Sequence, residues 1–201
     1  MKILDERTVL SLIKRGERII VAPGTRLTPA ARDAVRQHQV KIIEELSSYM
    51  PAPFPVRSVV VGADHGGYAL KETLVPRLRD MDLAVQDVGT HSPEAVDYPD
   101  FARMVARQVS EGRADRGIMI DSLGVASAMV ANRIAAVRAA ACWNTEVARS
   151  ARGHNDANVI TLGGKALDPE AAWEVVRTFL LEPFSGGRHE RRVRKIEAAG
   201  E

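Results

Sequence analysis

From residue 57 onward, short runs rich in β-branched residues alternate with longer runs of amphipathic, helix-forming pattern. The first pair is "RSVVVGA" and "YALKETLVPRLRDM", and the last is "NVITLGG" and "DPEAAWEVVRTFLLEP". This alternation is typical of βαβ units, in which crossover helices join parallel strands. The sequence therefore predicts the α/β class, as a Rossmann-like three-layer αβα sandwich with a five-stranded parallel sheet.

The strands and the later helices can be placed along this second part of the chain. We expect the five strands at residues 57–63, 83–89, 116–121, 138–143 and 158–164. The last long helix has a clear start, with Asp168 as its N-cap and Pro169 at its first position. The basic segment at the end, "RHERRVRKIEAAGE", predicts a C-terminal helix.

Residues 1–46 form a separate N-terminal appendage in this interpretation. The following segment, 47–57, contains three prolines and two serines, which is typical of a linker, and residues 58–201 form the main domain. We expect two helices in the appendage, at 6–14 and after a Thr28 cap, together with two strands. A unit of this size is marginally stable alone, so docking or oligomerisation is expected.

Composition excludes several classes of protein. The chain has 201 residues and one cysteine, Cys142, with no Cys/His cluster at metal-ligand spacing. We therefore expect no internal disulfide, no metal and no other cofactor. No apolar run approaches the roughly 20 residues of a membrane span, and the N-terminus lacks a signal-peptide pattern. The sequence predicts a cytoplasmic protein without a membrane partner.

A dense basic tract, "GRHERRVRK" at Gly187 to Lys195, stands out against a net charge of only +2. Arg188 and Arg192 lie four residues apart and are predicted to share one helical face, where two guanidinium groups suit a phosphate. A solvated tail and a nucleic-acid patch are the alternatives. No aromatic residue interleaves the tract, so we expect no nucleic-acid partner.

Two strand ends carry acidic residues. "VVVGADHGGYALKE" places Asp64 and His65 after a buried strand, with glycines that let a ligand approach the backbone. "GIMIDSLGVASAMV" places Asp121 after another strand, and the amides around Gly124 are suited to stabilise an enediolate. Either aspartate could instead cap its own turn, and the spacing leaves both interpretations open.

A third polar segment, "ARGHNDANVITLGGK", precedes and follows a buried strand. His154 is a candidate acid or base, because an imidazole can donate to or accept from a substrate hydroxyl. Asn155 lies beside it, and Lys165 follows the strand at the edge where α/β sheets bind ligands. The alternative for His154 is an ordinary solvated loop residue.

Several of these motifs occur together in one known family. "GADHGGYALKE", "VDYP", "ANR", "GHNDANV", "LGG" and "PFSGGRHERRV" resemble, in order and spacing, the type B ribose-5-phosphate isomerases and the galactose-6-phosphate isomerase subunits. The resemblance covers residues 59 to 196. It implies a metal-free aldose–ketose isomerase that interconverts ribose 5-phosphate and ribulose 5-phosphate, or a related tetrose to hexose phosphate, through a cis-enediol. It also implies a homodimer or tetramer with shared sites.

The resemblance assigns roles to individual residues of this chain. His154 would assist ring opening and Asn155 would bind the open sugar. Asp64 would contact sugar hydroxyls, and Ser122 and Gly124 lie in the anion-stabilising loop. The phosphate end would be held by His65, Lys165, Arg188 and Arg192.

The chain departs from the family pattern where that pattern reads Cys-Gly-Thr-Gly-x-Gly. Here the segment is "DSLGVA", so Asp121 replaces the cysteine base, Leu123 the threonine linked to ring opening and Ala126 a glycine. Cys142 belongs to another strand and cannot take over. One hypothesis makes Asp121 the base of an active isomerase. The alternative is a catalytically silent sugar-phosphate-binding or partner subunit of a hetero-oligomeric isomerase.

The N-terminal appendage has a resemblance of its own. "APGTRLTPAARDAV" is similar to short extensions on enzymes of bacterial microcompartments. This implies a location inside such a compartment, with its shell as a partner. The alternative is an oligomerisation arm.

Overall fold

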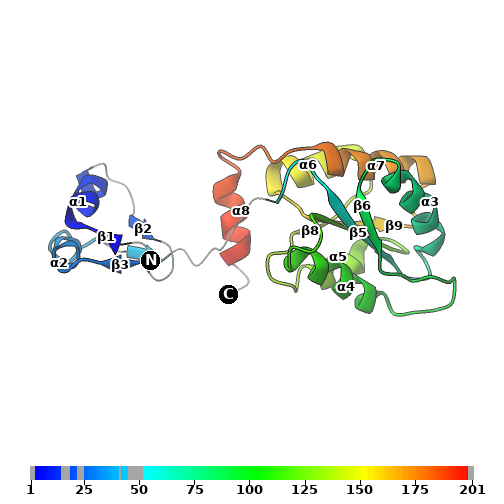
Figure 1. Ribbon diagram of the computed structural model, residues 1–201, viewed down its shortest axis with the longest axis horizontal. Helices are drawn as coiled ribbons and strands as arrows, with labels where there is room; N and C mark the ends of the chain where they lie inside the picture. Colours follow the sequence, from blue (N-terminus) through cyan, green and yellow to red (C-terminus); the bar gives the residue numbers. More distant parts are fainter. Residues whose placement is uncertain (1–2, 15–18, 22–24, 41, 45–51, 199–201) are drawn as a thin grey trace. The chain divides into compact units, whose positions relative to one another are not determined.

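The computed structural model describes residues 3–14, 19–21, 25–40, 42–44 and 52–198 (Figure 1). The chain forms two compact units, Met1–Ser48 and Tyr49–Glu201, and each has its own apolar core. None of the helices in the described ranges is long and apolar enough to cross a membrane.

The first unit contains two helices and two small parallel sheets. Its helices are α1 (Glu6–Lys14) and α2 (Pro29–Gln37), and its strands are β1 (Ile3–Leu4), β2 (Ile19–Val21), β3 (Arg26–Leu27) and β4 (Ile42–Glu44). β1 pairs with β3, and β2 pairs with β4. Thr28 caps α2, as predicted, because its hydroxyl accepts from the Ala31 amide at 3.2 Å. The sequence predicted two strands, and the two-residue strands β1 and β3 were missed.

The second unit is built on one parallel five-stranded sheet, as predicted. Its strands are β5 (Ser58–Ala63), β6 (Ala84–Asp87), β7 (Arg116–Asp121), β8 (Ala139–Ala141) and β9 (Val159–Gly163). Their order across the sheet is β6-β5-β7-β9-β8. The central strands β5, β7 and β9 are almost entirely buried, which explains why they read as continuous apolar runs.

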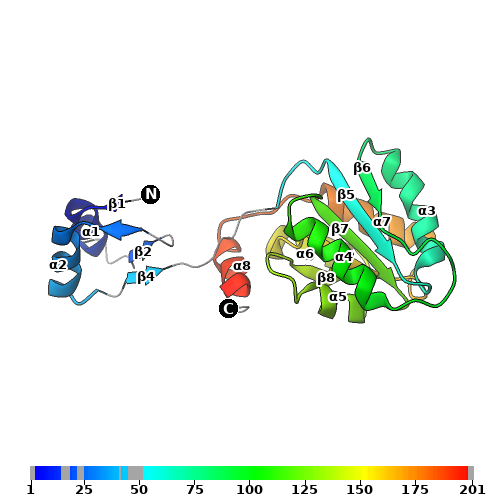
Figure 2. The same cartoon turned by 60° about the horizontal axis from the view of Figure 1, so that its bottom comes forward.

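Helices cover both faces of this sheet, which gives the predicted three layers (Figures 1 and 2). One face carries α3 (Tyr68–Arg79), α6 (Thr145–Asn155) and α7 (Pro169–Leu181), and the other carries α4 (Tyr98–Ser110) and α5 (Val125–Ala131). The short α8 (Glu190–Glu197) contacts α6. Asp168 caps α7 through the Ala171 amide at 2.9 Å, as predicted.

The strand order fixes where a ligand can enter. β5 connects to β6 on one side, and the chain then crosses to β7 on the other side of β5. Open α/β sheets bind ligands at such a reversal, outside the carboxyl ends of the strands. Ala63 and Ile120 are register partners, so Asp64 and Asp121 follow neighbouring strands side by side at this point. We call this end of the sheet the carboxyl edge and the other end the amino edge.

Candidate active site

A hollow of about 270 Å³ lies at the carboxyl edge, beyond β5 and β7. It combines two aspartates and two hydroxyl-bearing side chains with apolar residues from α5 and from the loop before it. Its lining residues are Asp64, Tyr98, Asp121, Ser122, Leu123, Val125, Ala126 and Met129. The hollow therefore contains the two strand-ending carboxylates that the sequence singled out.

Asp64 is 5% exposed and holds the turn between β5 and α3 through one oxygen. Its Oδ1 atom accepts from the Gly66 amide at 2.8 Å and from the Gly67 amide at 3.0 Å. A Cβ at Gly67 would collide with the Ile120 carbonyl, so this turn needs a glycine to lie against β7. Asp64 thus caps its turn and also lines the hollow, which joins the two roles that the spacing left open.

His65 is exposed at the same turn. Its Nδ1 atom lies 3.2 Å from the Val96 carbonyl oxygen and 3.3 Å from the Val96 amide nitrogen. These contacts hold one ring nitrogen against the loop before α4, so Nε2 is the nitrogen available to a ligand.

Asp121 is equally buried, at 5% exposure, but both of its oxygens are engaged. Oδ1 accepts from the Leu123 amide at 2.8 Å and from the Gly124 amide. Oδ2 accepts from the Ser127 amide at 3.1 Å and from the Ser127 hydroxyl. Asp121 therefore ties the whole loop between β7 and α5 to the end of its strand.

These bonds change what the loop offers to a substrate. The resemblance implies that the amides around Gly124 stabilise negative charge on the sugar, and Gly124 has a left-handed backbone, with φ +80°. In this chain the Leu123 and Gly124 amides donate to the Asp121 carboxylate instead. The Asp121 side chain therefore occupies two of the amide donors that the resemblance assigns to the substrate.

Lys165 and Ser122 lie at the same edge. Lys165 follows β9, and its amide donates to the Ser122 carbonyl at 3.1 Å. The Lys165 side chain is exposed, and Ser122 is half-buried. The carboxyl edge therefore brings together Asp64, His65, Asp121, Ser122 and Lys165.

His154 and Asn155 lie elsewhere, at the end of α6. Because α6 runs back between the parallel strands β8 and β9, its last residues reach the amino edge. The five residues of β9 alone separate the two edges by roughly 13 Å. One chain therefore does not bring His154 and Asn155 to the hollow. Both side chains are exposed.

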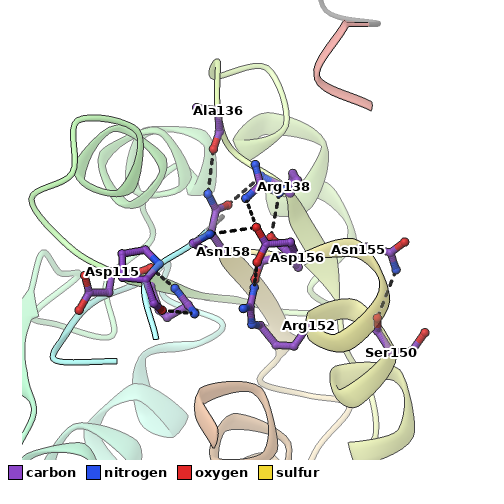
Figure 3. A network of polar contacts seen from close by, with 12 residues as sticks. Asp115, Ala136, Arg138, Ser150, Arg152, Asn155, Asp156 and Asn158 are labelled. Atoms are coloured by element: carbon purple, nitrogen blue, oxygen red, sulfur yellow. Dashed lines mark hydrogen bonds and ion pairs between the residues drawn. The ribbon is translucent and has the colours of Figure 1, made fainter. Parts of the chain in front are cut away.

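A buried polar network fixes the end of α6, and Figure 3 shows it. Asp156 accepts from Arg152 at 2.7 Å and from Arg138 at 2.9 Å. Arg138 also pairs with Glu197 of α8. Asn155 points away from this network and donates to the Ser150 carbonyl at 3.3 Å. The network thus sets where His154, Asn155 and α8 are presented.

The start of α8 adds a second imidazole to this edge. The His189 ring stacks on His154 with centroids 4.4 Å apart and planes at 4°. Arg188 Nε lies 3.4 Å from His189 Nε2. Burial, followed by electrostatic interaction with the neighbouring His154, Arg188 and Arg192 side chains, lowers the pKa of His189. The amino edge therefore presents arginines beside a histidine that favours its neutral form.

The predicted helical face shared by Arg188 and Arg192 is wrong. α8 begins at Glu190, and Arg188 lies in the turn before it. Gly186 and Gly187 have left-handed backbone angles, φ +59° and +53°, which end any helix on that side. Both arginines are exposed at this end of the chain.

Three residues of these surroundings were not singled out from the sequence. Tyr98 lines the hollow, Ser127 binds Asp121, and His189 stacks on His154. Tyr98 stands in the "VDYP" motif and His189 in the basic tract, so the sequence motifs could have pointed to both residues. Ser127 had none, because it is one polar residue among small helix formers.

Cys142 follows β8 and is 3% exposed, and burial raises the pKa of its thiol to about 12. The described ranges contain no group of three or more His, Cys, Asp or Glu side chains that could hold a metal ion.

Comparison with known proteins agrees with this fold. The model of the ribose/galactose isomerase family matches residues 59–196. A ribose-5-phosphate isomerase B structure from Clostridium thermocellum is 43% identical, with a TM-score of 0.70, over 71% of this chain and 96% of that one. The ribose-5-phosphate isomerase B of Escherichia coli is 38% identical over 71% of this chain and 96% of its own length.

A relative named for another sugar is also similar. The D-erythrulose-4-phosphate isomerase of Pectobacterium atrosepticum is 36% identical over 69% of this chain and 92% of its own length. The chain thus has the fold and sequence of a sugar-phosphate isomerase. It belongs to the ribose/galactose isomerase family.

Proposed function

We propose that the chain is an aldose–ketose isomerase for a phosphorylated sugar of four to six carbons, working through a cis-enediol. The observation that carries this proposal is the hollow at the strand-order reversal of a family fold, lined by the carboxylates of Asp64 and Asp121. A carboxylate beside a bound sugar can take the proton from the carbon next to the carbonyl. The sequence alone predicts Asp121 as this base.

The working form in this proposal is a homodimer or tetramer with shared sites. The hollow is small for a ligand site, since such pockets usually have volumes of roughly 300–1,000 Å³. Its rim exposes apolar side chains, with Leu123 at 66% and Met129 at 67%. Contiguous exposed apolar groups are typical of interaction surfaces, which supports this part of the proposal. A second copy would cover them and bring its own amino edge to the hollow.

Each half of the site then supplies a different part of the chemistry. One copy contributes Asp64, His65, Ser122 and Lys165. The second copy contributes His154 to ring opening, Asn155 to the open sugar, and Arg188 and Arg192 to the phosphate. Two guanidinium groups suit a phosphate because each offers several donors in a fixed plane.

The test is an isomerase assay on ribose 5-phosphate and a panel of tetrose, pentose and hexose phosphates. The purified chain is expected to turn over at least one of them. His154→Ala should then retain sugar-phosphate binding and lose turnover on cyclic substrates. Absence of turnover on every sugar of the panel would contradict the proposed activity.

One observation favours a second candidate function. The residue at the cysteine position, Asp121, has both oxygens bonded within its own loop, as expected for a subunit that binds sugar phosphate without turning it over. Such a subunit would lend His154 and the two arginines to a cysteine-bearing paralogue. Binding of ribose 5-phosphate without turnover, weakened by Arg188→Ala, would support this candidate.

For the N-terminal unit we propose attachment, either to a microcompartment shell or to other copies of the chain. The unit has its own core, including Val9 and Ile19, and lies outside the family match. Deletion of residues 1–48 is expected to preserve isomerase turnover and to abolish co-purification with shell proteins or to reduce the native mass. Loss of turnover on deletion would contradict this role.

A further inference from the structure

The proposed isomerisation needs an acceptor for the proton on the carbon next to the carbonyl, and this inference rests on that proposal. The acceptor must line the hollow and carry a lone pair that the protein does not already use. Tyr98 and Ser122 contribute hydroxyl groups to the lining and no carboxylate. Asp64 and Asp121 are the two carboxylates among the lining residues.

The two carboxylates differ in the number of hydrogen bonds that they accept. An ionised carboxylate offers about four lone-pair positions on its two oxygens. Asp121 accepts four hydrogen bonds, two on each oxygen, from Leu123, Gly124 and Ser127. Accepting a substrate proton would require one of these buried donors to lose its partner, which is unfavourable.

Asp64 has a different arrangement at the same depth. Its Oδ1 atom accepts from the Gly66 and Gly67 amides, and within the described part of the chain its Oδ2 atom accepts no hydrogen bond. The two bonds on Oδ1 prevent the carboxylate from rotating. They orient one free oxygen in a residue that lines the hollow, and this pre-organisation is what a catalytic base needs.

We propose that Asp64, through Oδ2, is the base that moves the proton between the two carbons, and that Asp121 keeps the adjoining loop in shape. In the aldose-to-ketose direction, Oδ2 takes the proton from C2. The electron pair of that C–H bond forms the C1=C2 double bond as the C1=O double bond opens, and O1 takes a proton from solvent water to give the cis-enediol. The O2 hydroxyl then gives its proton to solvent water as C2=O forms, and C1 takes the carbon-bound proton back from the Asp64 carboxyl.

The experiment measures exchange of the C2 hydrogen with solvent. The probe is ribose 5-phosphate deuterated at C2, or the equally labelled panel sugar that the wild-type chain turns over fastest, and loss of deuterium is followed by NMR. Asp64→Asn suits this test, because its amide oxygen can still accept from Gly66 and Gly67. Asp82→Asn is the matched control, since Asp82 is exposed at a positive φ that Asn tolerates.

We expect Asp64→Asn to slow the exchange by about 10²- to 10⁴-fold, with an unchanged melting temperature and retained binding of the unlabelled sugar. Exchange in Asp64→Asn within tenfold of wild type would overturn the inference. So would a folded Asp121→Asn chain that loses exchange while Asp64→Asn keeps it. A wild-type chain that exchanges no sugar of the panel would overturn the proposed function, and the inference with it.

Discussion

The turn after β5 and the turn after β7 begin with the same residue type at neighbouring positions of the sheet. Asp64 and Asp121 are both 5% exposed, and each uses Oδ1 to hold two amides of its own turn. They differ at Oδ2, which accepts from Ser127 in Asp121 and has no described protein partner in Asp64. The comparison teaches that the position of an acid after a strand does not decide its role. The donors in the following loop decide it.

In the proposed mechanism, proton transfer does not depend on the cysteine that the family pattern places at position 121. Both oxygens of Asp121 accept hydrogen bonds from the loop after β7. In the proposal, the oxygen that takes the proton is Oδ2 of Asp64, in the turn after β5. The central claim is therefore that Asp64 of one chain works with His154 of another.

The largest effect is expected on stability when each aspartate is truncated. Asp121→Ala leaves three amides and a buried hydroxyl without their acceptor, which should lower the free energy of unfolding by about 3–5 kcal/mol. Asp64→Ala leaves two amides, and about 1–2 kcal/mol is expected. Denaturant unfolding checks both values. Equal losses in the two variants would break the comparison.

A smaller effect is expected for the coupling between Asp121 and Ser127. The Ser127 hydroxyl donates to Asp121, so the effects of Asp121→Asn and Ser127→Ala should not add. A double-mutant cycle should give a coupling of about 1–2 kcal/mol. Asp64→Asn combined with Ser127→Ala is the matched control, and those two effects should add. Additivity in the first pair would show that Ser127 does not hold Asp121.

A weaker effect should appear in the pH dependence of stability, and it should come from the amino edge. Burial and neighbouring cations lower the pKa of His189, so the folded chain favours the neutral ring. As pH falls through the ordinary value of 6.5, the unfolded chain takes up a proton that the folded chain does not, and stability is lost. The melting temperature should therefore fall between pH 8 and pH 5.5, and less so in His189→Gln.

The control for this pH effect is His91→Gln, because His91 is exposed on a different part of the domain. That variant should keep the wild-type pH dependence. If His189→Gln kept it as well, the pH effect would belong to other groups, and the carboxyl edge would be the first place to search.

The smallest effect concerns the thiol. Cys142 is buried and its pKa is raised to about 12, so it should not react with a thiol reagent in the native chain at pH 8. Reaction of one thiol per chain is expected after unfolding in guanidinium. Rapid native labelling accompanied by loss of turnover would introduce a third candidate beside the two aspartates.

Much of the second unit could be predicted because its signals are local. Five apolar runs alternate with helical patterns, and the Asp168–Pro169 start of α7 depends on residues next to each other in the chain. The strands β1 and β3 were missed, since two residues are too short to show a period of two. The position of Asp121 at a strand end was predictable for the same local reason.

The parts of the site that escaped prediction depend on three-dimensional geometry. Nothing in the spacing shows that the Ser127 hydroxyl donates to Asp121 and so occupies a lone pair that a base would need. The sequence also places His154 near Lys165, only eleven positions apart, although β9 carries them to opposite edges of the sheet. Which groups share a site depends on the edge of the sheet that each segment reaches and, in the proposed oligomer, on a second chain.

Subunit complementation tests directly whether Asp64 of one chain and His154 of another act in the same site. Asp64→Asn and His154→Ala chains, each inactive alone, would be co-expressed with different tags and purified as mixed oligomers. If Asp64 of one chain works with His154 of another, one of the two sites in each mixed dimer combines both wild-type residues, and turnover should recover to about half the wild-type level. Mixed Asp64→Asn and Asp64→Ala chains should stay inactive. Turnover no higher than that of the two parents would contradict the account.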